Sequence, residues 1–296
     1  MEAHLLGQLA PVVAPRSHWL PSGGTLRALE GGEGPTVVLL HGRGHAAPMW
    51  FSYLTVLARG RRVLALDLPG FGLSSAPEGP VRTAEDGVRF FTEPVEELLK
   101  VLAPGPVAVV GHSLGGLVAV ELALRGRVPV ERLVLIDSMG LGPEMTRRAR
   151  LFFRAGPERV ARSLGPGMFH RLLPPPETPL GQRLGMLGYE LLAVPGGRPR
   201  ASKAFDTLVP LAGEVFHRRE QLASLRQPAL LVWGEREDTL PVSLAVEAAK
   251  RLAEVRLLRV VAGHSPHLER PEVVLPAIKS FLDDAPGQHP PSSIPP

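Results

Sequence analysis

Gly111-His112-Ser113-Leu114-Gly115-Gly116 stands between a short apolar run, residues 107–110, and a helix-prone stretch, residues 117–124. This order predicts a sharp turn from a strand into a helix, with Ser113 at its apex. A serine hydroxyl acts as a nucleophile only when it is held clear of its neighbours and within reach of a base. The turn strains the serine backbone and brings the chain so close that only glycine fits two residues on either side. Gly111 and Gly115 meet that requirement, so the hexapeptide predicts a nucleophile elbow.

The elbow also predicts where negative charge on an attacked carbonyl would be stabilised. The amide of Leu114, at the start of the following helix, points at the space above Ser113. Upstream, a buried strand at residues 36–40 runs into His41-Gly42-Arg43-Gly44, a glycine-rich turn that can present backbone amides. We expect the amides of Arg43 and Leu114 to form an oxyanion hole, and the ring of His41 to hydrogen-bond the turn. The side chain of Arg43 either reaches a substrate carboxylate or turns to solvent.

Candidate acids and a candidate base follow the elbow. A strand ends in Trp233-Gly234-Glu235-Arg236-Glu237-Asp238, and a late Gly263-His264 pair follows it. The chain order of nucleophile, acid and histidine is the one expected for an α/β-hydrolase.

At this point the chain resembles the α/β-hydrolase superfamily, in its capped single-domain branch of esterases, haloperoxidases and carbon-carbon hydrolases. The resemblance covers roughly residues 17–283. It rests on five motifs in order, at residues 41–44, 67–74, 111–116, 233–234 and 263–271. It implies an α/β fold in which helices flank a mostly parallel central sheet and a helical cap is inserted after the sixth strand.

The resemblance places the catalytic base at His264, with His267 as the competing histidine. In relatives, an aspartate commonly stands three residues after the glycine of the Trp-Gly pair and four before a proline. That register falls on Glu237 here, whereas residue type favours the neighbouring Asp238, so both remain candidates for the acid. Asp137, at the end of the sixth strand, is a more remote third choice whose alternative role is to cap the next turn.

Strand and helix patterns alternate along the chain, which predicts a mostly parallel sheet. An N-terminal hairpin is expected at residues 17–32. The segment from 141 to 225 breaks the alternation, and the resemblance implies that it is the helical cap over the site. We therefore expect a core built from residues 1–140 and 226–284. The tail, residues 285–296, is rich in Pro and Ser and is expected to be disordered.

Composition excludes several classes of protein. The 296 residues are 44% hydrophobic and include no cysteine, so neither disulfides nor thiol chemistry contribute. No cofactor and no metal site are expected. The first twenty residues do not form a secretory signal, and no run of about 18 apolar residues could span a membrane. We expect a cytoplasmic protein that acts on a small molecule and has no membrane partner.

Positive charge is concentrated in the predicted cap. Residues 141–222 carry 13 basic and 7 acidic residues, a net +6, whereas the rest of the chain carries −2. This excess is either a solvated, arginine-rich helical surface or a segment that attracts anionic substrates. Nucleic-acid binding is not expected, because the basic residues are not interleaved with aromatic ones.

The nucleophile determines the class of reaction. Relatives that cleave carbon-halogen bonds or epoxides place aspartate at the elbow, so Ser113 excludes that chemistry. A serine with a histidine and a carboxylate forms an acyl intermediate, which favours a carboxylic ester hydrolase acting on a small ester. The alternatives are a carbon-carbon hydrolase of vinylogous diketones and a small-molecule receptor that retains the triad. Trp50 and Met139 are candidates for the substrate pocket wall, although core packing also accounts for both.

Overall fold

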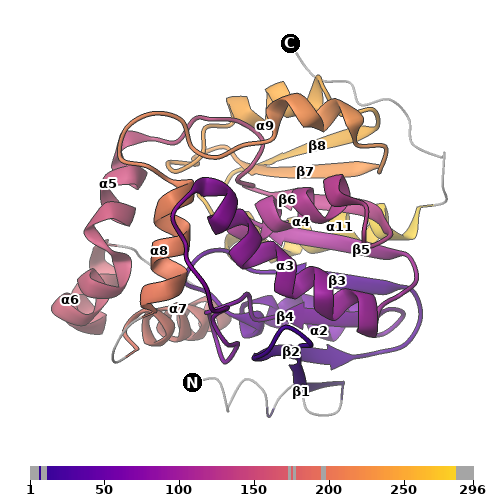
Figure 1. Ribbon diagram of the computed structural model, residues 1–296, viewed down its shortest axis with the longest axis horizontal. Helices are drawn as coiled ribbons and strands as arrows, with labels where there is room; N and C mark the ends of the chain where they lie inside the picture. Colours follow the sequence, from indigo (N-terminus) through magenta and orange to yellow (C-terminus); the bar gives the residue numbers. More distant parts are fainter. Residues whose placement is uncertain (1–6, 8–11, 173–174, 176–177, 195–197, 285–296) are drawn as a thin grey trace.

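Eight strands form one sheet in the order β1-β2-β4-β3-β5-β6-β7-β8, with β1 and β8 at its edges (Figure 1). The computed structural model describes Gly7 and residues 12–172, 175, 178–194 and 198–284. The tail predicted at 285–296 lies outside the described residues. The strands are β1 (Val13–Trp19), β2 (Thr25–Gly31), β3 (Thr36–Leu40), β4 (Arg62–Leu66), β5 (Val107–His112), β6 (Val130–Ile136), β7 (Ala229–Gly234) and β8 (Val255–Val260).

The first two strands form the predicted N-terminal hairpin. β1 pairs with β2 in antiparallel register, from Val13 opposite Gly31 to Trp19 opposite Thr25. The turn between them places Gly23 and Gly24 at positive φ angles of 97° and 80°, a conformation that favours glycine. β2 joins the remaining strands through an antiparallel pairing with β4, and all other pairings are parallel. The predicted mostly parallel sheet is therefore confirmed.

Helices cover both faces of the sheet (Figure 1). Successive strand residues point to opposite faces, so Val38 and Leu40 pack in one apolar cluster and Val37 and Leu39 in the other. The first cluster includes side chains of α3 (Ala84–Leu102), α4 (Leu114–Arg125) and α9 (Ser243–Ala249). The second includes side chains of η1 (Ala47–Trp50), α2 (Phe51–Leu57) and α11 (Pro271–Asp283). No helix within the described ranges is long and apolar enough to cross a membrane.

Only helices and loops connect β6 to β7 within the described residues. The helices are α5 (Arg147–Ala155), α6 (Pro157–Leu172), α7 (Pro179–Leu192), α8 (Pro199–Leu208) and η2 (Arg219–Ser224). The four α-helices lie beyond the left-hand end of the sheet in Figure 1. An apolar cluster joins Leu184, Leu187 and Leu191 of α7 to Ala46 and Met49, which lie just after β3. The segment therefore packs over the region where β3 ends.

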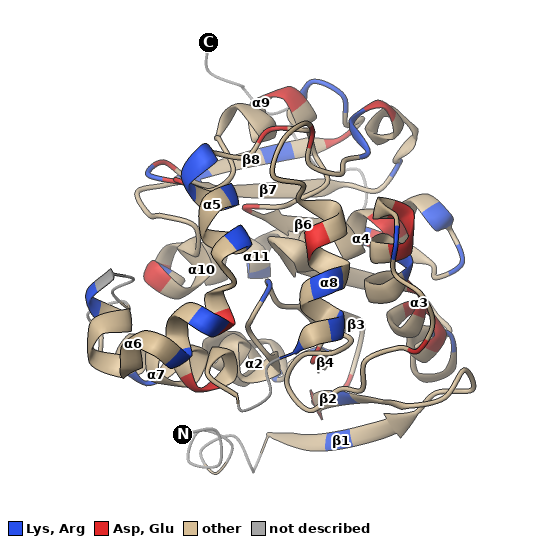
Figure 2. Cartoon of the chain, turned by 60° about the vertical axis from the view of Figure 1, so that its left-hand side comes forward, with Lys and Arg blue, Asp and Glu red and all other residues tan. Residues whose placement is uncertain are grey.

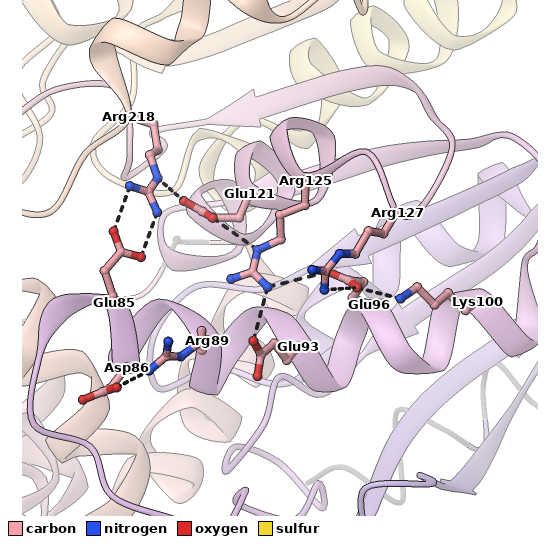
Figure 3. Close-up of polar contacts among 10 residues, drawn as sticks. All are labelled: Glu85, Asp86, Arg89, Glu93, Glu96, Lys100, Glu121, Arg125, Arg127 and Arg218. Carbon is pink, nitrogen blue, oxygen red and sulfur yellow. Dashed lines mark hydrogen bonds and ion pairs between the residues drawn. The ribbon is translucent and has the colours of Figure 1, made fainter.

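A network of ion pairs fastens the end of this segment to the core (Figure 3). Arg218 makes a two-pronged contact with Glu85 of α3, with both N···O distances 2.9 Å, and also donates to Glu121 of α4. Glu121 is 3% exposed and also accepts from Arg125 at 3.5 Å. Nearby, Glu96 of α3 pairs with Arg125 and two further cations. A buried carboxylate shared by two arginines is a point where a single change leaves several charges unpaired.

Glu121→Gln should lower the free energy of unfolding by about 1–3 kcal/mol, because Arg125 and Arg218 lose their shared counter-charge in a largely dry environment. Unfolding in urea, followed by circular dichroism, measures the effect. Glu93→Gln is the matched control. Its carboxylate also pairs with Arg125, at 3.5 Å, but is 53% exposed, so the change should be below about 0.5 kcal/mol. Equal midpoints for the two variants would show that the buried network contributes nothing specific.

Candidate active site

The backbone at Ser113 has the strained geometry expected of an elbow. Its φ and ψ angles are 51° and −113°, which non-glycine residues rarely adopt. A Cβ atom on Gly111 would lie 2.3 Å from the carbonyl oxygen of Gly115. A Cβ on Gly115 would lie 2.3 Å from the carbonyl oxygen of Leu40, at the end of β3. The two glycines therefore allow β5 and α4 to meet closely enough to leave Ser113 at the apex.

Three side chains from separate loops form a hydrogen-bonded series. The Oγ of Ser113 lies 3.1 Å from Nε2 of His264, and Nδ1 of His264 lies 2.5 Å from Oε2 of Glu237. Ser113 follows β5, Glu237 follows β7 and His264 follows β8, so the carboxyl ends of three parallel strands position all three groups. Nε2 of His264 can accept the hydroxyl proton while its Nδ1–H donates to the carboxylate. This arrangement can activate a serine for attack on a carbonyl.

The structure separates the two candidate acids. Glu237 accepts the amide of Leu240 at 3.1 Å and that of Thr239 through its Oε1, and its side chain is 1% exposed. Although burial disfavours its charged form, the attraction of His264 and these hydrogen bonds hold the pKa of Glu237 below its usual value. The Asp238 side chain is 60% exposed and pairs with Arg148 at 3.3 Å. The side chain that faces the imidazole is therefore that of Glu237.

Asp137, the third candidate, lies behind Glu237. It is fully buried at a positive φ of 37°, and its Oδ1 accepts the amide of Gly234 at 3.0 Å. Burial, followed by the neighbouring charge of Glu237, raises the pKa of Asp137 well above its usual value. In these two adjacent carboxyl groups, the pKa of Asp137 is therefore shifted upward and that of Glu237 downward.

These two carboxyl groups and His264 also make up the only group of three described side chains with potential metal-ligand atoms close together, within 4.8 Å. The His264 imidazole already donates a hydrogen bond to the Glu237 carboxylate. The group is therefore arranged as a carboxylate that orients a histidine, and not as a set of ligand atoms free to bind a metal ion.

His267, the competing histidine, is enclosed away from the nucleophile. It is 2% exposed, its ring packs on Trp50 at 4.9 Å, and its carbonyl accepts the hydroxyl of Tyr53. Burial holds its pKa well below the usual value, with the nearby histidines adding to the effect. His112 is also buried, and its Nε2 donates to the carbonyl of His264 at 2.8 Å. The His267 ring packs on the ring of His112, and His112 in turn lies against the imidazole of His264 and steadies its loop.

The turn after β3 touches the nucleophile. A Cβ on Gly42 would lie 3.3 Å from Cβ of Ser113. His41 has the expected hydrogen bonds: its Nδ1–H donates to the Gly42 carbonyl at 2.7 Å, and its Nε2 accepts the Leu68 amide at 2.9 Å. Burial lowers the pKa of His41 to about 4, so the ring is neutral near pH 7. Within the described part of the chain, the amides of Arg43 and Leu114 donate to no protein acceptor, as an oxyanion hole requires.

The side chain of Arg43 turns inward and not to solvent. It is 4% exposed and forms an ion pair with Glu158 of α6 at 3.0 Å. Its guanidinium carbon lies 4.9 Å from the ring centre of Phe205 and 5.5 Å from that of Phe153. Solvent exposure was one of two outcomes open from sequence, and these contacts with the segment between β6 and β7 decide against it.

The two candidate pocket-wall residues are both fully enclosed. Trp50 is 0% exposed and packs against Tyr53 and His267 in the apolar cluster that contains α2 and α11. Met139 is 1% exposed, and its amide donates to the carbonyl of Ser113 at 3.0 Å. Of the two, only Met139 has a contact with the nucleophile residue, and that contact is through its backbone.

Sequence reasoning missed the role of Glu269. Its Oε2 accepts the amide of Gly263 at 2.9 Å and its Oε1 accepts that of Ser265 at 3.3 Å. The carboxylate therefore accepts the amides of the two residues on either side of His264. The one available signal was its presence in the late motif at residues 263–271, which names no partner for it.

Comparisons with known proteins identify the family of the chain. Residues 37–277 match the profile of the Alpha/beta hydrolase family. A pimeloyl-[acyl-carrier protein] methyl ester esterase from Nitrosospira multiformis is 30% identical over 84% of this chain and 95% of its own length. The acetyltransferase component of an acetoin cleaving system from Pseudomonas putida is 32% identical over 85% of this chain. The chain spans only 65% of that relative, and 12% of a polyketide synthase from Burkholderia thailandensis that is 28% identical.

Solved structures show the same architecture. A 2-hydroxy-6-oxo-6-phenylhexa-2,4-dienoate hydrolase from a Rhodococcus strain superposes with a TM-score of 0.75 and 26% identity, covering 92% of this chain and all of that one. A bacterial membrane phospholipase A superposes with a TM-score of 0.75 and 27% identity, covering 95% and 91% of the two chains. A thermophilic esterase from Thermogutta terrifontis does so with a TM-score of 0.71 and 25% identity, covering 91% and 98%.

Replacing each candidate acid by its amide separates their roles. Glu237→Gln should lower kcat by roughly a hundredfold or more, because the imidazolium formed during reaction loses its orienting negative charge. Asp238→Asn should change kcat by less than about twofold, because its side chain contacts only solvent and Arg148. Steady-state kinetics on a chromogenic ester measure both. The reverse pattern would transfer the role to Asp238, and equally mild effects in both would point to Asp137.

Proposed function

Because the chain belongs to the alpha/beta hydrolase family, we propose that it is a serine hydrolase that cleaves small carboxylic esters through an acyl-enzyme intermediate on Ser113. The observation that carries the proposal is the hydrogen-bonded series from Ser113 through His264 to Glu237, which begins at a strained turn. The similarity to a methyl ester esterase and to a thermophilic esterase supports ester chemistry.

In the proposed acylation, Oγ of Ser113 attacks the ester carbonyl while its proton passes to Nε2 of His264. The carboxylate of Glu237 stabilises the resulting imidazolium. The carbonyl oxygen becomes negatively charged, and the amides of Arg43 and Leu114 donate to it. When the tetrahedral species collapses, the bond to the alkoxy oxygen breaks, His264 returns the proton to that oxygen, and the alcohol leaves.

Deacylation repeats the same steps with water. His264 removes a proton from water, the hydroxide oxygen attacks the acyl carbonyl, and the bond to Ser113 Oγ breaks as the proton returns to the serine. Each cycle consumes one ester and one water and releases one acid and one alcohol. His112 and Glu269 hold the His264 loop by its backbone, so the imidazole can alternate between acceptor and donor without moving.

We further propose that residues 141–225 form a cap over the site, with residues 1–140 and 226–284 as the core. The apolar contact of α7 with the region after β3, and the contact of Glu158 with Arg43, support this division. A cap that encloses the site would admit single small molecules and limit their size.

A carbon-carbon hydrolase is the second candidate function. It is favoured by the similarity to the Rhodococcus hydrolase of a phenylhexadienoate, which covers nearly the whole chain. The same serine and histidine would serve both reactions, so comparing kcat/KM on a para-nitrophenyl ester with kcat/KM on a vinylogous diketone separates them. Turnover would also exclude a receptor that keeps the three residues without using them.

A fluorophosphonate should modify Ser113 stoichiometrically, because its hydroxyl lies at a strained turn and contacts the imidazole of His264. Ser113→Ala should abolish labelling and lower ester turnover by roughly a thousandfold or more. Peptide mass spectrometry identifies the modified serine, and Ser265→Ala, also beside His264, is the control that should still be labelled. Modification at any other serine would refute the proposal.

Short acyl esters, of roughly two to eight carbons, should be preferred. Each added methylene contributes about 0.8 kcal/mol until an enclosed pocket is full, after which clashes dominate. The rate on a short ester should saturate smoothly below its solubility limit. A sharp rise once droplets form, or a preference for long-chain lipid esters, would show that the segment opens onto an interface, as an enzyme resembling the phospholipase would require.

A further inference from the structure

A cavity of about 320 Å³ lies where Arg43 meets α5, α6 and α8. Six basic side chains line it, and Figure 2 shows that basic residues recur on these three helices. The six are Arg43, Arg154, Arg159, Arg162, Arg198 and Lys203. Glu158 and Asp206 are the acidic residues among them, so the lining carries a net +4. A concave surface of one sign concentrates counter-ions of the other.

The acidic residues leave most of this charge uncompensated. Glu158 is committed to Arg43 at 3.0 Å and also accepts the hydroxyl of Ser202 at 3.2 Å. Arg154, Arg162 and Lys203 form no ion pair with any residue in the described ranges. The cations at the cavity therefore repel one another, and an anion placed among them relieves that repulsion.

One cation is held in a fixed orientation at the cavity wall. The Arg43 side chain is 4% exposed, packs against Phe153 and Phe205, and keeps its buried Nε–H without a partner. A rigid guanidinium with a spare donor is suited to a carboxylate or phosphate. Arg198 lies on the same wall, where it donates to the carbonyl of Gly70 at 3.2 Å.

Arg43 also joins the cavity to the reaction. Its amide is a proposed oxyanion donor beside Ser113, and its side chain lines the cavity. An anion bound there would be separated from the scissile carbonyl by about the length of the Arg43 side chain. We propose that this cavity is a subsite for the anionic end, a carboxylate or a phosphate, of the ester substrate. This inference rests on the proposed ester hydrolysis and adds the substrate class to it.

Paired substrates test the preference. One is the mono-para-nitrophenyl ester of a short dicarboxylic acid, and the other is the para-nitrophenyl ester of the uncharged acid of equal length. The quantity measured is the ratio of kcat/KM for the charged ester to that for the neutral one. We expect the native protein to favour the charged ester by roughly tenfold at low salt, and less as salt screens the cavity.

Matched double variants separate the cavity from overall charge. Arg154→Gln with Arg162→Gln removes two cavity cations, one from α5 and one from α6. Arg147→Gln with Arg171→Gln removes two exposed cations from the same two helices that do not line the cavity. The first pair should reduce the ratio by roughly tenfold and the second by less than about twofold. If both pairs reduced the ratio equally, the preference would come from the overall positive charge of the segment, and the proposed subsite would be overturned.

Binding without turnover distinguishes this inference from the proposed function. Calorimetry on the Ser113→Ala protein, with glutarate and with inorganic phosphate as separate probes, should detect one bound anion and show which of the two is favoured. The cavity double variant should weaken that binding, whereas the control pair should not. If neither ester is hydrolysed but the anion binds, the proposed function fails alone. If the neutral ester is hydrolysed equally well and neither anion binds, only the subsite fails.

Discussion

The close contact between the elbow and the end of β3 is the constraint on which the rest of the site depends. A Cβ on Gly115 would meet the carbonyl of Leu40, and one on Gly42 would meet the ring of His112 beside Ser113, so no side chain fits at either glycine. This contact brings the strained serine beside the turn whose amides can meet an oxyanion. Two buried apolar layers, one on each face of the sheet, supply the rigidity that keeps such strain in place.

The two carboxyl groups near His264 are held in different electrostatic environments. Burial disfavours the charged form of each. The imidazole and two amides donate to Glu237 and hold its pKa below its usual value, whereas Asp137 accepts one amide and its pKa is raised by burial and by the neighbouring charge of Glu237. Among the nearby histidines, burial lowers the pKa of His45 to about 3 and that of His112 well below its usual value. The imidazole of His264 is 25% exposed and is the one that contacts both the serine and the carboxylate.

Residue patterns in the sequence predicted the elements whose formation depends mainly on neighbouring residues. The mostly parallel sheet, the N-terminal hairpin and the helix that follows Ser113 were predicted from residue periodicity and glycine spacing, and all three form. The choice between Glu237 and Asp238 did not follow, because adjacent residues on an irregular loop point in different directions and nothing in their spacing fixes which faces His264. The sequence also left open whether the side chain of Arg43 turns inward or toward solvent. It depends on Glu158, which lies 115 positions later in the chain.

Ion pairs between residues distant in sequence hold the segment between β6 and β7 against the core. These pairs account for part of its positive charge. At its end, Arg218 is neutralised by Glu85 and Glu121 of the core. At its start, Glu158 receives Arg43 from the core side. These pairs account for the attachment of the segment, but they do not neutralise the cations on α5, α6 and α8. Structural ion pairs therefore explain only part of the arginine content. Several of the remaining cations line the cavity beside Arg43, where a substrate anion would complete the pairing.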